Sequence, residues 1–292
     1  MTARLSELLR GIADIAAADD REISALEVDS RRVRPGALFC ALPGVRVDGR
    51  DFVGAAARAG AAAIVYEANG VGIPRLSVPT IGVERLRAHI GTLADRFYGS
   101  PSQRLVVIGV TGTNGKTTCT QLLAQALDAA PGRCAVIGTL GFGYPGALNE
   151  SLHTTPDAIT LQRLLSEYAA AGARYVSMEV SSHALEQGRV NAVAFDVAVF
   201  TNLTRDHLDY HGDMGAYGAS KARLFDMPGL RHAVINADDA FGRELIARVS
   251  TRIPTLSYGL ANGEIRAEDL ELTHDGMRLT VAAPQGRVAR ET

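Results

Sequence analysis

The chain has 292 residues, of which 47% are hydrophobic, so it is long enough for two domains that each bury a core. Its formal net charge of −2 gives no electrostatic reason to expect a nucleic acid or a membrane surface as partner. Three cysteines without CxxC spacing argue against a disulfide framework or a structural zinc site. No stretch supplies the ~18 apolar residues that a membrane span needs, and we expect a cytoplasmic protein.

The first hundred residues alternate short apolar runs with Gly and Pro turns, which predicts a small α/β domain. Leu5, Leu8, Leu9 and Ile12 recur at helical spacing and predict an N-terminal helix. The remaining predicted elements are extended chain at 23–28, a strand at 37–42, a helix at 51–59, a strand at 61–66 and a helix at 83–98. We therefore assign residues 1–99 to an N-terminal domain and residues 103–292 to a second domain.

The second domain begins with a continuous apolar run at 105–110, which is typical of a strand buried on both faces of a parallel sheet. Strands and helices then alternate, and this alternation predicts βαβ units in a doubly wound parallel sheet. The predicted elements are helices ending at 127 and covering 157–171, and strands at 175–180, 196–200, 233–235 and 255–258. Residues 265–292 are rich in β-strand signals.

Residues 111–118 read TGTNGKTT and lie between a predicted strand and a helix, which is the setting of a phosphate-binding loop. Glycines let the backbone N–H groups surround phosphate oxygens, and the helix N-terminus adds a positive dipole. Val110 stands where the strict pattern has glycine, so the loop is a variant. A turn that binds nothing is the alternative. The expected nucleotide-binding residues are Gly112, Thr113, Asn114, Gly115, Lys116, Thr117 and Thr118.

Further polar residues follow other predicted strands of this domain. Glu179 lies near the end of one strand, residues 202–207 follow the next, and Asn236 and Asp238 follow another. Ligands of a doubly wound sheet bind beyond the carboxyl ends of its strands, so we expect these residues to converge. Magnesium prefers oxygen ligands, and Thr117 and Glu179 are the predicted pair for such an ion.

The loop sequence 112–118 resembles that of Mur ligases and of folylpolyglutamate synthetases, which both make amide bonds through an acyl phosphate. Other stretches narrow the resemblance to the Mur ligase family: HTTP at 153–156, EVSSHALEQGR at 179–189, TNLTRDHLDYHG at 201–212, and DSR, PGALF and DG at 29–31, 35–39 and 48–49. The resemblance covers almost the whole chain in order. His153 departs from the asparagine often found at its position.

This resemblance implies a UDP-binding N-terminal domain, a phosphate-loop ATPase domain, and the cofactors ATP and Mg²⁺. It implies addition of the third amino acid, meso-diaminopimelate in preference to lysine, to UDP-MurNAc-L-Ala-D-Glu. Lys116, Lys221 and His207 are the implied catalytic residues; His207 and a carbamate on Lys221 would hold a second ion, and Asn202 would contact the nucleotide. The implied substrate contacts are Val28, Ser30, His153, Thr154, Thr155, Ser181, Gln187 and Arg189.

Other readings of the same residues stay open. Residues 154–157 also form an ordinary helix start, Ser181 can act as a helix cap, and His183 and His211 can be structural hydrogen-bonding groups. A folylpolyglutamate synthetase is the nearest rival, although it would normally begin near the phosphate loop. A nucleotide-binding protein without ligase activity is a second rival. Family members carry a third, C-terminal domain, and the sequence leads us to expect that the central domain is incomplete.

Overall fold

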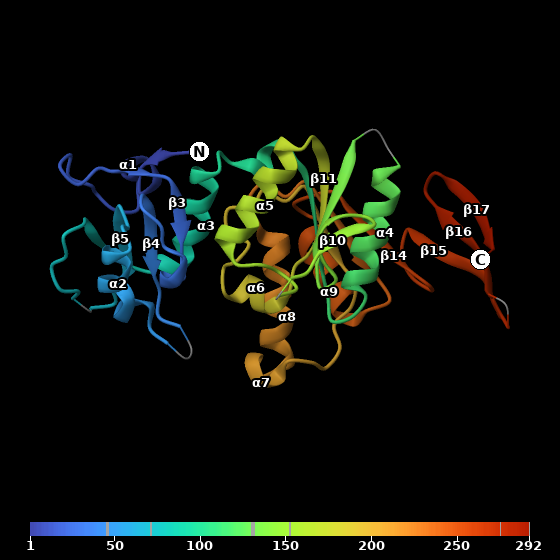
Figure 1. The fold of residues 1–292 in the computed structure, drawn as a ribbon. Helices are drawn as coiled ribbons and strands as arrows, with labels where there is room; N and C mark the ends of the chain where they lie inside the picture. Colours follow the sequence, from blue (N-terminus) through green and yellow to red (C-terminus); the bar gives the residue numbers. More distant parts are fainter. Residues whose placement is uncertain (45–46, 71, 130–131, 152, 275, 292) are drawn as a thin grey trace. The chain divides into compact units, whose positions relative to one another are not determined.

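The computed structural model describes residues 1–44, 47–70, 72–129, 132–151, 153–274 and 276–291 (Figure 1). The chain divides into two compact units. The first unit contains residues 1–104, 156–170 and 187–193, and the second contains residues 105–155, 171–186 and 194–292. Two segments from the later half of the sequence therefore pack with the first hundred residues.

The first unit is built on a four-stranded parallel sheet with the order β3-β4-β5-β6. Its central strand β4 is buried at all five positions, as its apolar sequence requires. One face of the sheet packs on α3 and α5, and the other packs on α2. The elements are β1 (Ala3–Arg4), α1 (Leu5–Leu8), β2 (Glu22–Ile23), β3 (Ala25–Glu27), β4 (Ala37–Ala41), α2 (Val53–Arg58), β5 (Ala63–Glu67), β6 (Thr80–Val83), α3 (Leu86–Phe97) and α5 (Ala158–Ala170), with short 3₁₀ turns at Ser30–Arg32, Gly49–Phe52 and Pro101–Arg104.

The second unit contains an eleven-stranded sheet with the order β10-β9-β8-β11-β7-β12-β13-β14-β15-β16-β17. The strands from β8 to β15 in this order run parallel, and antiparallel strands extend both edges, β9 and β10 beside β8 and β16 and β17 beside β15. The strands are β7 (Val106–Thr111), β8 (Arg133–Gly138), β9 (Gly141–Tyr144), β10 (Ala147–Asn149), β11 (Ala173–Glu179), β12 (Val197–Phe200), β13 (His232–Asn236), β14 (Thr255–Gly259), β15 (Ile265–Thr273), β16 (Gly276–Ala283) and β17 (Gly286–Glu291).

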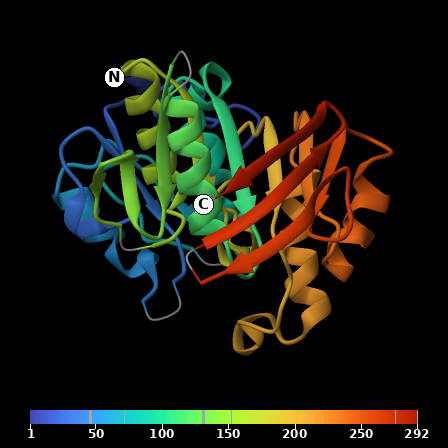
Figure 2. The same ribbon diagram turned by 90° about the vertical axis from the view of Figure 1, so that its right-hand side faces the viewer.

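Helices cover the parallel part of this sheet. α4 (Lys116–Asp128) packs against β8 and β11, and α9 (Ala240–Val249) packs against β13 and β14. Three further helices connect successive parallel strands in the sequence: α6 (Ser182–Glu186) follows β11, and α7 (Leu208–His211) and α8 (Met214–Ala222) follow β12. A 3₁₀ turn (Arg223–Asp226) follows α8. Figure 2 shows β15, β16 and β17 as three adjacent red strands. The predicted doubly wound parallel sheet is confirmed, with antiparallel edges added.

Some boundaries differ from the sequence predictions. The predicted helix at 51–59 begins as a 3₁₀ turn, because Asp48 caps that turn by accepting the Arg50 N–H, and only Val53–Arg58 is α-helical. The predicted N-terminal helix is a single turn, Leu5–Leu8. Strands β1, β6, β8, β9 and β10 were not predicted. Among the described residues, no helix is long and apolar enough to cross a membrane.

Candidate active site

The glycine-rich loop joins the end of β7 to the start of α4 in the second unit. Gly112 and Gly115 both have positive φ angles, 147° and 82°. A Cβ atom at Gly112 would also overlap the hydroxyl oxygen of Thr201. Glycine is therefore required at position 112 by both backbone conformation and space. A glycine-rich turn that leads into a helix N-terminus is the arrangement that binds anions in other proteins.

The segment that follows β12 holds the loop from the other side. The Asn202 side chain accepts from the Asn114 backbone N–H at 3.0 Å and donates to the Asn114 carbonyl at 3.1 Å. The Thr113 N–H donates to the Asn202 carbonyl at 2.8 Å, and the Thr113 hydroxyl accepts from the Thr204 N–H at 3.0 Å. These paired contacts hold the loop against the segment that follows β12. They also occupy the Asn202 side chain in this structure.

The sequence contains only two lysines, and both reach the same carbonyl oxygen. Lys116 Nζ donates to the carbonyls of Gly112 and Thr113, each at 2.8 Å, and Lys221 Nζ donates to the Gly112 carbonyl at 2.8 Å. Lys221 is only 1% exposed, and its amine lies 4.3 Å from the centre of the Tyr217 ring. Burial, followed by the nearby charge of Lys116, lowers the pKa of Lys221 to about 7. Burial also lowers the pKa of Lys116.

A second cluster surrounds Glu179, which is 1% exposed at the end of β11. Its carboxylate accepts from the Thr117 hydroxyl at 2.9 Å, from the Thr139 N–H at 2.8 Å and from the Thr139 hydroxyl at 3.2 Å. A Cβ atom at Gly138 would overlap the same carboxylate, so this glycine makes room for Glu179. The two predicted magnesium ligands, Thr117 and Glu179, are therefore in direct contact.

Thr154, Thr155 and Ser181 adjoin this cluster. The Thr155 hydroxyl donates to the Glu179 carbonyl at 2.9 Å and accepts from the Ser181 N–H at 3.2 Å. The Thr154 and Thr139 hydroxyl oxygens are 3.0 Å apart. His153 is exposed, and its backbone bonds to the Ser151 hydroxyl. The Ser181 hydroxyl accepts a hydrogen bond from the Ala184 N–H, so this serine also caps α6, as its alternative interpretation expected.

The other predicted substrate contacts belong to the first unit. Val28 follows β3 and is 40% exposed, and Ser30 begins a 3₁₀ turn after Asp29, whose side chain accepts from the Arg31 N–H. Gln187 and Arg189 are paired by hydrogen bonds from Arg189 Nε and Nη2 to the Gln187 amide oxygen, at 2.9 and 2.6 Å. Val28 and Ser30 thus lie just after β3, and Gln187 and Arg189 lie just after α6.

His207 lies in a group of aromatic side chains. It precedes α7 with a left-handed φ of 52°, and its ring meets His183 edge to face at a centroid distance of 4.8 Å. Tyr210 lies 4.2 Å from the His183 ring, and the His211 ring nitrogen Nε2 is 2.9 Å from the Ser182 hydroxyl. Burial lowers the pKa of His211, which favours a neutral ring. Within the part of the chain that the structure describes, no three His, Cys, Asp or Glu residues are grouped as metal ligands.

Two residues of these clusters were not singled out from the sequence. Thr139 follows β8, a strand that was not predicted, so it could not be counted among the polar residues that follow parallel strands, as Glu179 was. The Tyr217 hydroxyl lies 3.3 Å from the Thr113 hydroxyl, and its ring faces Lys221. Tyr217 stands in a helix without any motif, and only the packing of α8 brings it to the loop. Asn236, in contrast, was expected at this edge of the sheet, and from the end of β13 its side chain donates to the Thr201 carbonyl at 2.7 Å.

A strand, a glycine-rich loop with lysine and threonine, and a helix on a parallel sheet define the class of phosphate-loop α/β proteins. Comparisons with known proteins narrow this class. Residues 110–291 match the Mur ligase middle domain, and residues 22–98 match the Mur ligase family catalytic domain. The middle-domain match alone spans more than half of the chain, which therefore belongs to the Mur ligase family.

Individual relatives agree with this assignment. The UDP-N-acetylmuramoyl-L-alanyl-D-glutamate–2,6-diaminopimelate ligase of Pseudomonas syringae pv. tomato is 52% identical over 279 residues, covering 94% of this chain and 57% of that protein. A solved structure of a ligase with the same name is 35% identical with a TM-score of 0.86, and the match covers all of this chain and 60% of that one. The MurF ligase of Thermotoga maritima in complex with ADP shares the fold, with 23% identity and a TM-score of 0.61 over 91% of this chain and 57% of that chain. The chain thus spans less than two thirds of the length of these relatives.

Proposed function

We propose that this chain takes part in the ATP-dependent addition of meso-diaminopimelate to UDP-MurNAc-L-Ala-D-Glu, in the synthesis of peptidoglycan precursors. The D-glutamate carboxylate takes the γ-phosphoryl group of ATP, which gives an acyl phosphate and ADP. The amine of the third amino acid then attacks the acyl carbon, phosphate leaves, and an amide bond remains. The reaction belongs in the cytoplasm, where ATP is available.

The observation that carries this proposal is the joint arrangement of the loop, the two lysines and Glu179. Lys116 and Lys221 place two amines at one turn of the loop, and Glu179 receives the Thr117 hydroxyl at the start of α4. Transfer of a phosphoryl group depends mainly on positioning and on neutralising charge, which Lys116 would do directly and Lys221, as a carbamate, would do by holding a metal ion. The names of the relatives at about half identity add the muramyl substrate and the amino acid, and ADP in a MurF ligase of the same fold supports use of ATP.

The donor set near Thr117 fits a magnesium ion. A hydroxyl and a carboxylate 2.9 Å apart are oxygen ligands of the kind that Mg²⁺ prefers, and phosphate oxygens and water would complete its shell. Gly138 leaves space beside the carboxylate. When bound, the ion would neutralise charge on the phosphate oxygens. Lys116, at the start of α4, would place a further positive charge beside the terminal phosphates.

We assign the second predicted ion site to His207 and Lys221. A lysine takes up carbon dioxide only as the neutral amine, and burial lowers the pKa of Lys221 to about 7, where half of the amine is neutral. The carbamate would add two oxygen donors beside the loop. Lys221 therefore acts in the proposal as a source of negative charge, whereas Lys116 acts as a cation.

We also propose the substrate contacts implied by the sequence: Val28 and Ser30 for the uridine diphosphate part, and His153, Thr154, Thr155, Ser181, Gln187 and Arg189 for the sugar and peptide. Asn202 is proposed as a nucleotide contact. The proposed domain boundaries remain 1–99 and 103–292. Helix α5 and residues 187–193 then belong to the second domain in sequence, while they pack with the first unit.

Calorimetric titration of the chain with UDP-MurNAc-L-Ala-D-Glu tests the proposal. We expect saturable binding that is lost in the double variant Ser30→Ala and Arg189→Ala. A folate substrate serves as the control ligand, and Ser250→Ala with Arg231→Ala, two exposed positions outside the proposed site, serves as the control variant. Preference for the folate, or no binding by a sample with a native circular dichroism spectrum, would overturn the proposal.

A further inference from the structure

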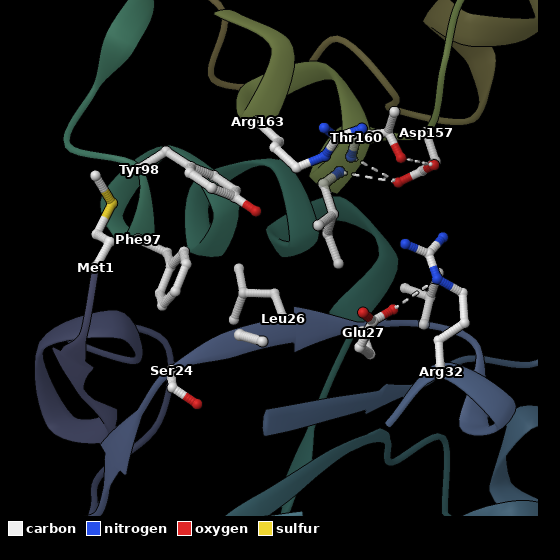
Figure 3. A pocket seen from close by; sticks show the side chains of 13 residues that line it. Met1, Ser24, Leu26, Glu27, Arg32, Phe97, Tyr98, Asp157, Thr160 and Arg163 are labelled. Carbon is white, nitrogen blue, oxygen red and sulfur yellow. Dashed lines mark hydrogen bonds and ion pairs between the residues drawn. The ribbon is translucent and has the colours of Figure 1, made fainter. Parts of the chain in front are cut away.

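The first unit contains a cavity of about 310 Å³ that the proposed reaction does not use as a whole. It runs beside the edge strand β3 and is closed by the end of α3 and the first turns of α5 (Figure 3). Its volume lies at the lower end of the roughly 300–1,000 Å³ that is usual for small-ligand sites. A compact organic molecule therefore fits it.

The floor of the cavity is apolar. Leu26, Phe97 and Ile159 contribute to it, and each is less than a tenth exposed. These side chains belong to the core cluster of the first unit, so their positions are fixed by packing on several sides. A rigid apolar floor favours a ligand with a flat or branched hydrocarbon body.

Two polar groups at the cavity lack a strong partner. The Glu27 carboxylate has an 18% exposed side chain, and its one ion pair, with Arg32, is long at 3.7 Å. The Tyr98 hydroxyl points into the cavity from the other side, and no hydrogen bond holds it within the described part of the chain (Figure 3). Burial raises the pKa of Glu27 and of Tyr98, so both groups are partly removed from water. Such groups gain most from a ligand that supplies a charge-assisted hydrogen bond.

The other charged side chains that line the cavity are hydrogen-bonded, ion-paired or largely exposed to water. Asp157 accepts from the Thr160 N–H at 3.0 Å and from the Thr160 hydroxyl at 2.6 Å, which makes it the cap of α5. Arg163 pairs with Glu167 at 2.6 Å, and Arg32 has a 67% exposed side chain, so water screens both cations. The Glu27 carboxylate, whose ion pair with Arg32 is long, is thus the charged group of the cavity that would gain most from a close ion pair with a bound cation.

We propose that this cavity binds a small organic ammonium ion, whose apolar body rests on Leu26, Phe97 and Ile159 while its ammonium group pairs with the Glu27 carboxylate. The Tyr98 ring adds an aromatic face to which a cation is attracted. The cavity ends at Val28, which the proposed function places at the muramyl substrate.

Titration with 2-phenylethylammonium, followed by calorimetry or by ligand-observed NMR, tests the proposal. We expect saturable binding in the millimolar range or tighter, at least about tenfold stronger than binding of the neutral probe 2-phenylethanol. Glu27→Gln should weaken the ammonium by about tenfold and leave the alcohol unchanged. Tyr98→Phe should weaken the ammonium less. Glu22→Gln, an exposed position on β2, is the matched control and should bind as the wild type does.

Three results would overturn the proposal: no saturation by a natively folded sample, equal affinity for the ammonium and the alcohol, or an unchanged affinity in Glu27→Gln. Because the muramyl dipeptide is titrated separately, failure here leaves the proposed ligase function standing. Failure of the muramyl titration likewise leaves the cavity proposal to its own result.

Discussion

Replacing Lys221 by methionine should make the folded chain more stable, although the residue is proposed to be catalytic. The folded pKa of this amine is about 7, against an ordinary value of 10.5. One pKa unit corresponds to about 1.4 kcal/mol, so holding the charged amine in its buried position costs roughly 5 kcal/mol below pH 7. Loss of the hydrogen bond to Gly112 offsets about 1 kcal/mol of the gain, since Lys116 still serves that carbonyl.

The direction of the pH dependence follows from proton binding. Between pH 7 and 10.5 the unfolded chain holds a proton on Lys221 that the folded chain has released, so wild-type stability rises with pH across this window. The advantage of Lys221→Met should be roughly 3 to 4 kcal/mol at pH 6 and should shrink by about 1.4 kcal/mol per pH unit above pH 7, until little of it remains near pH 10.

Urea unfolding at pH 6, 8 and 9.5, followed by far-UV circular dichroism in bicarbonate-free buffer, measures this difference. Bicarbonate is excluded because a carbamate would replace the buried cation by an anion. Arg223→Met, on the same stretch of chain but half exposed, is the control and should change stability by less than about 1 kcal/mol at every pH. A destabilised Lys221→Met, or a difference that does not vary with pH, would refute the argument from burial.

Other predictions address the loop, the amine and the thiols. Gly112→Ala should abolish binding of Mg²⁺-ATP, measured by calorimetry, and should lower the free energy of unfolding by at least about 2 kcal/mol. Gly229→Ala is the control, because Gly229 also has a positive φ but has open space around it, and this change should cost less. Equal effects of the two variants would contradict the close contact between position 112 and Thr201. With ¹³C-bicarbonate, one carbamate signal should appear by NMR and vanish in Lys221→Met but not in Lys116→Met; its survival in Lys221→Met would assign it elsewhere. Burial raises the pKa of Cys40 to about 12 and that of Cys134 to about 11, so both thiols should resist alkylation at pH 8 until urea unfolds the chain. Peptide mass spectrometry measures the modification, and alkylation of either cysteine in the native protein would contradict its burial.

The parallel sheet and its phosphate loop could be predicted from sequence because the signals are local. A run of buried apolar residues such as 105–110 marks a central strand, and TGTNGKTT specifies both the turn and the helix start. The polar residues that follow successive strands were expected to converge, since parallel neighbours bring their carboxyl ends to one edge. Thr117 and Glu179 do meet in this way, 62 positions apart in the sequence.

The remaining features depend on contacts that a sequence pattern does not encode. Tyr217 faces Lys221 only because α8 packs beside the loop, and nothing in the sequence of that helix marks the residue. Helix α5 follows the strands of the second domain in sequence, yet Ala158 and Ile159 enter the core of the first unit. A local pattern specifies the helix but not which of two cores buries its apolar face.

The proposed function requires that the muramyl dipeptide contact three segments of the chain, residues 28–31, 154–155 and 181–189. Hydrogen–deuterium exchange with and without UDP-MurNAc-L-Ala-D-Glu tests this most directly, because each peptide reports its own protection. The proposal predicts slower exchange in peptides that contain residues 28–31, 154–155 and 181–189, with little change in β15–β17. Unchanged exchange in any of these three segments, or equal protection in the presence of UDP alone, would contradict it.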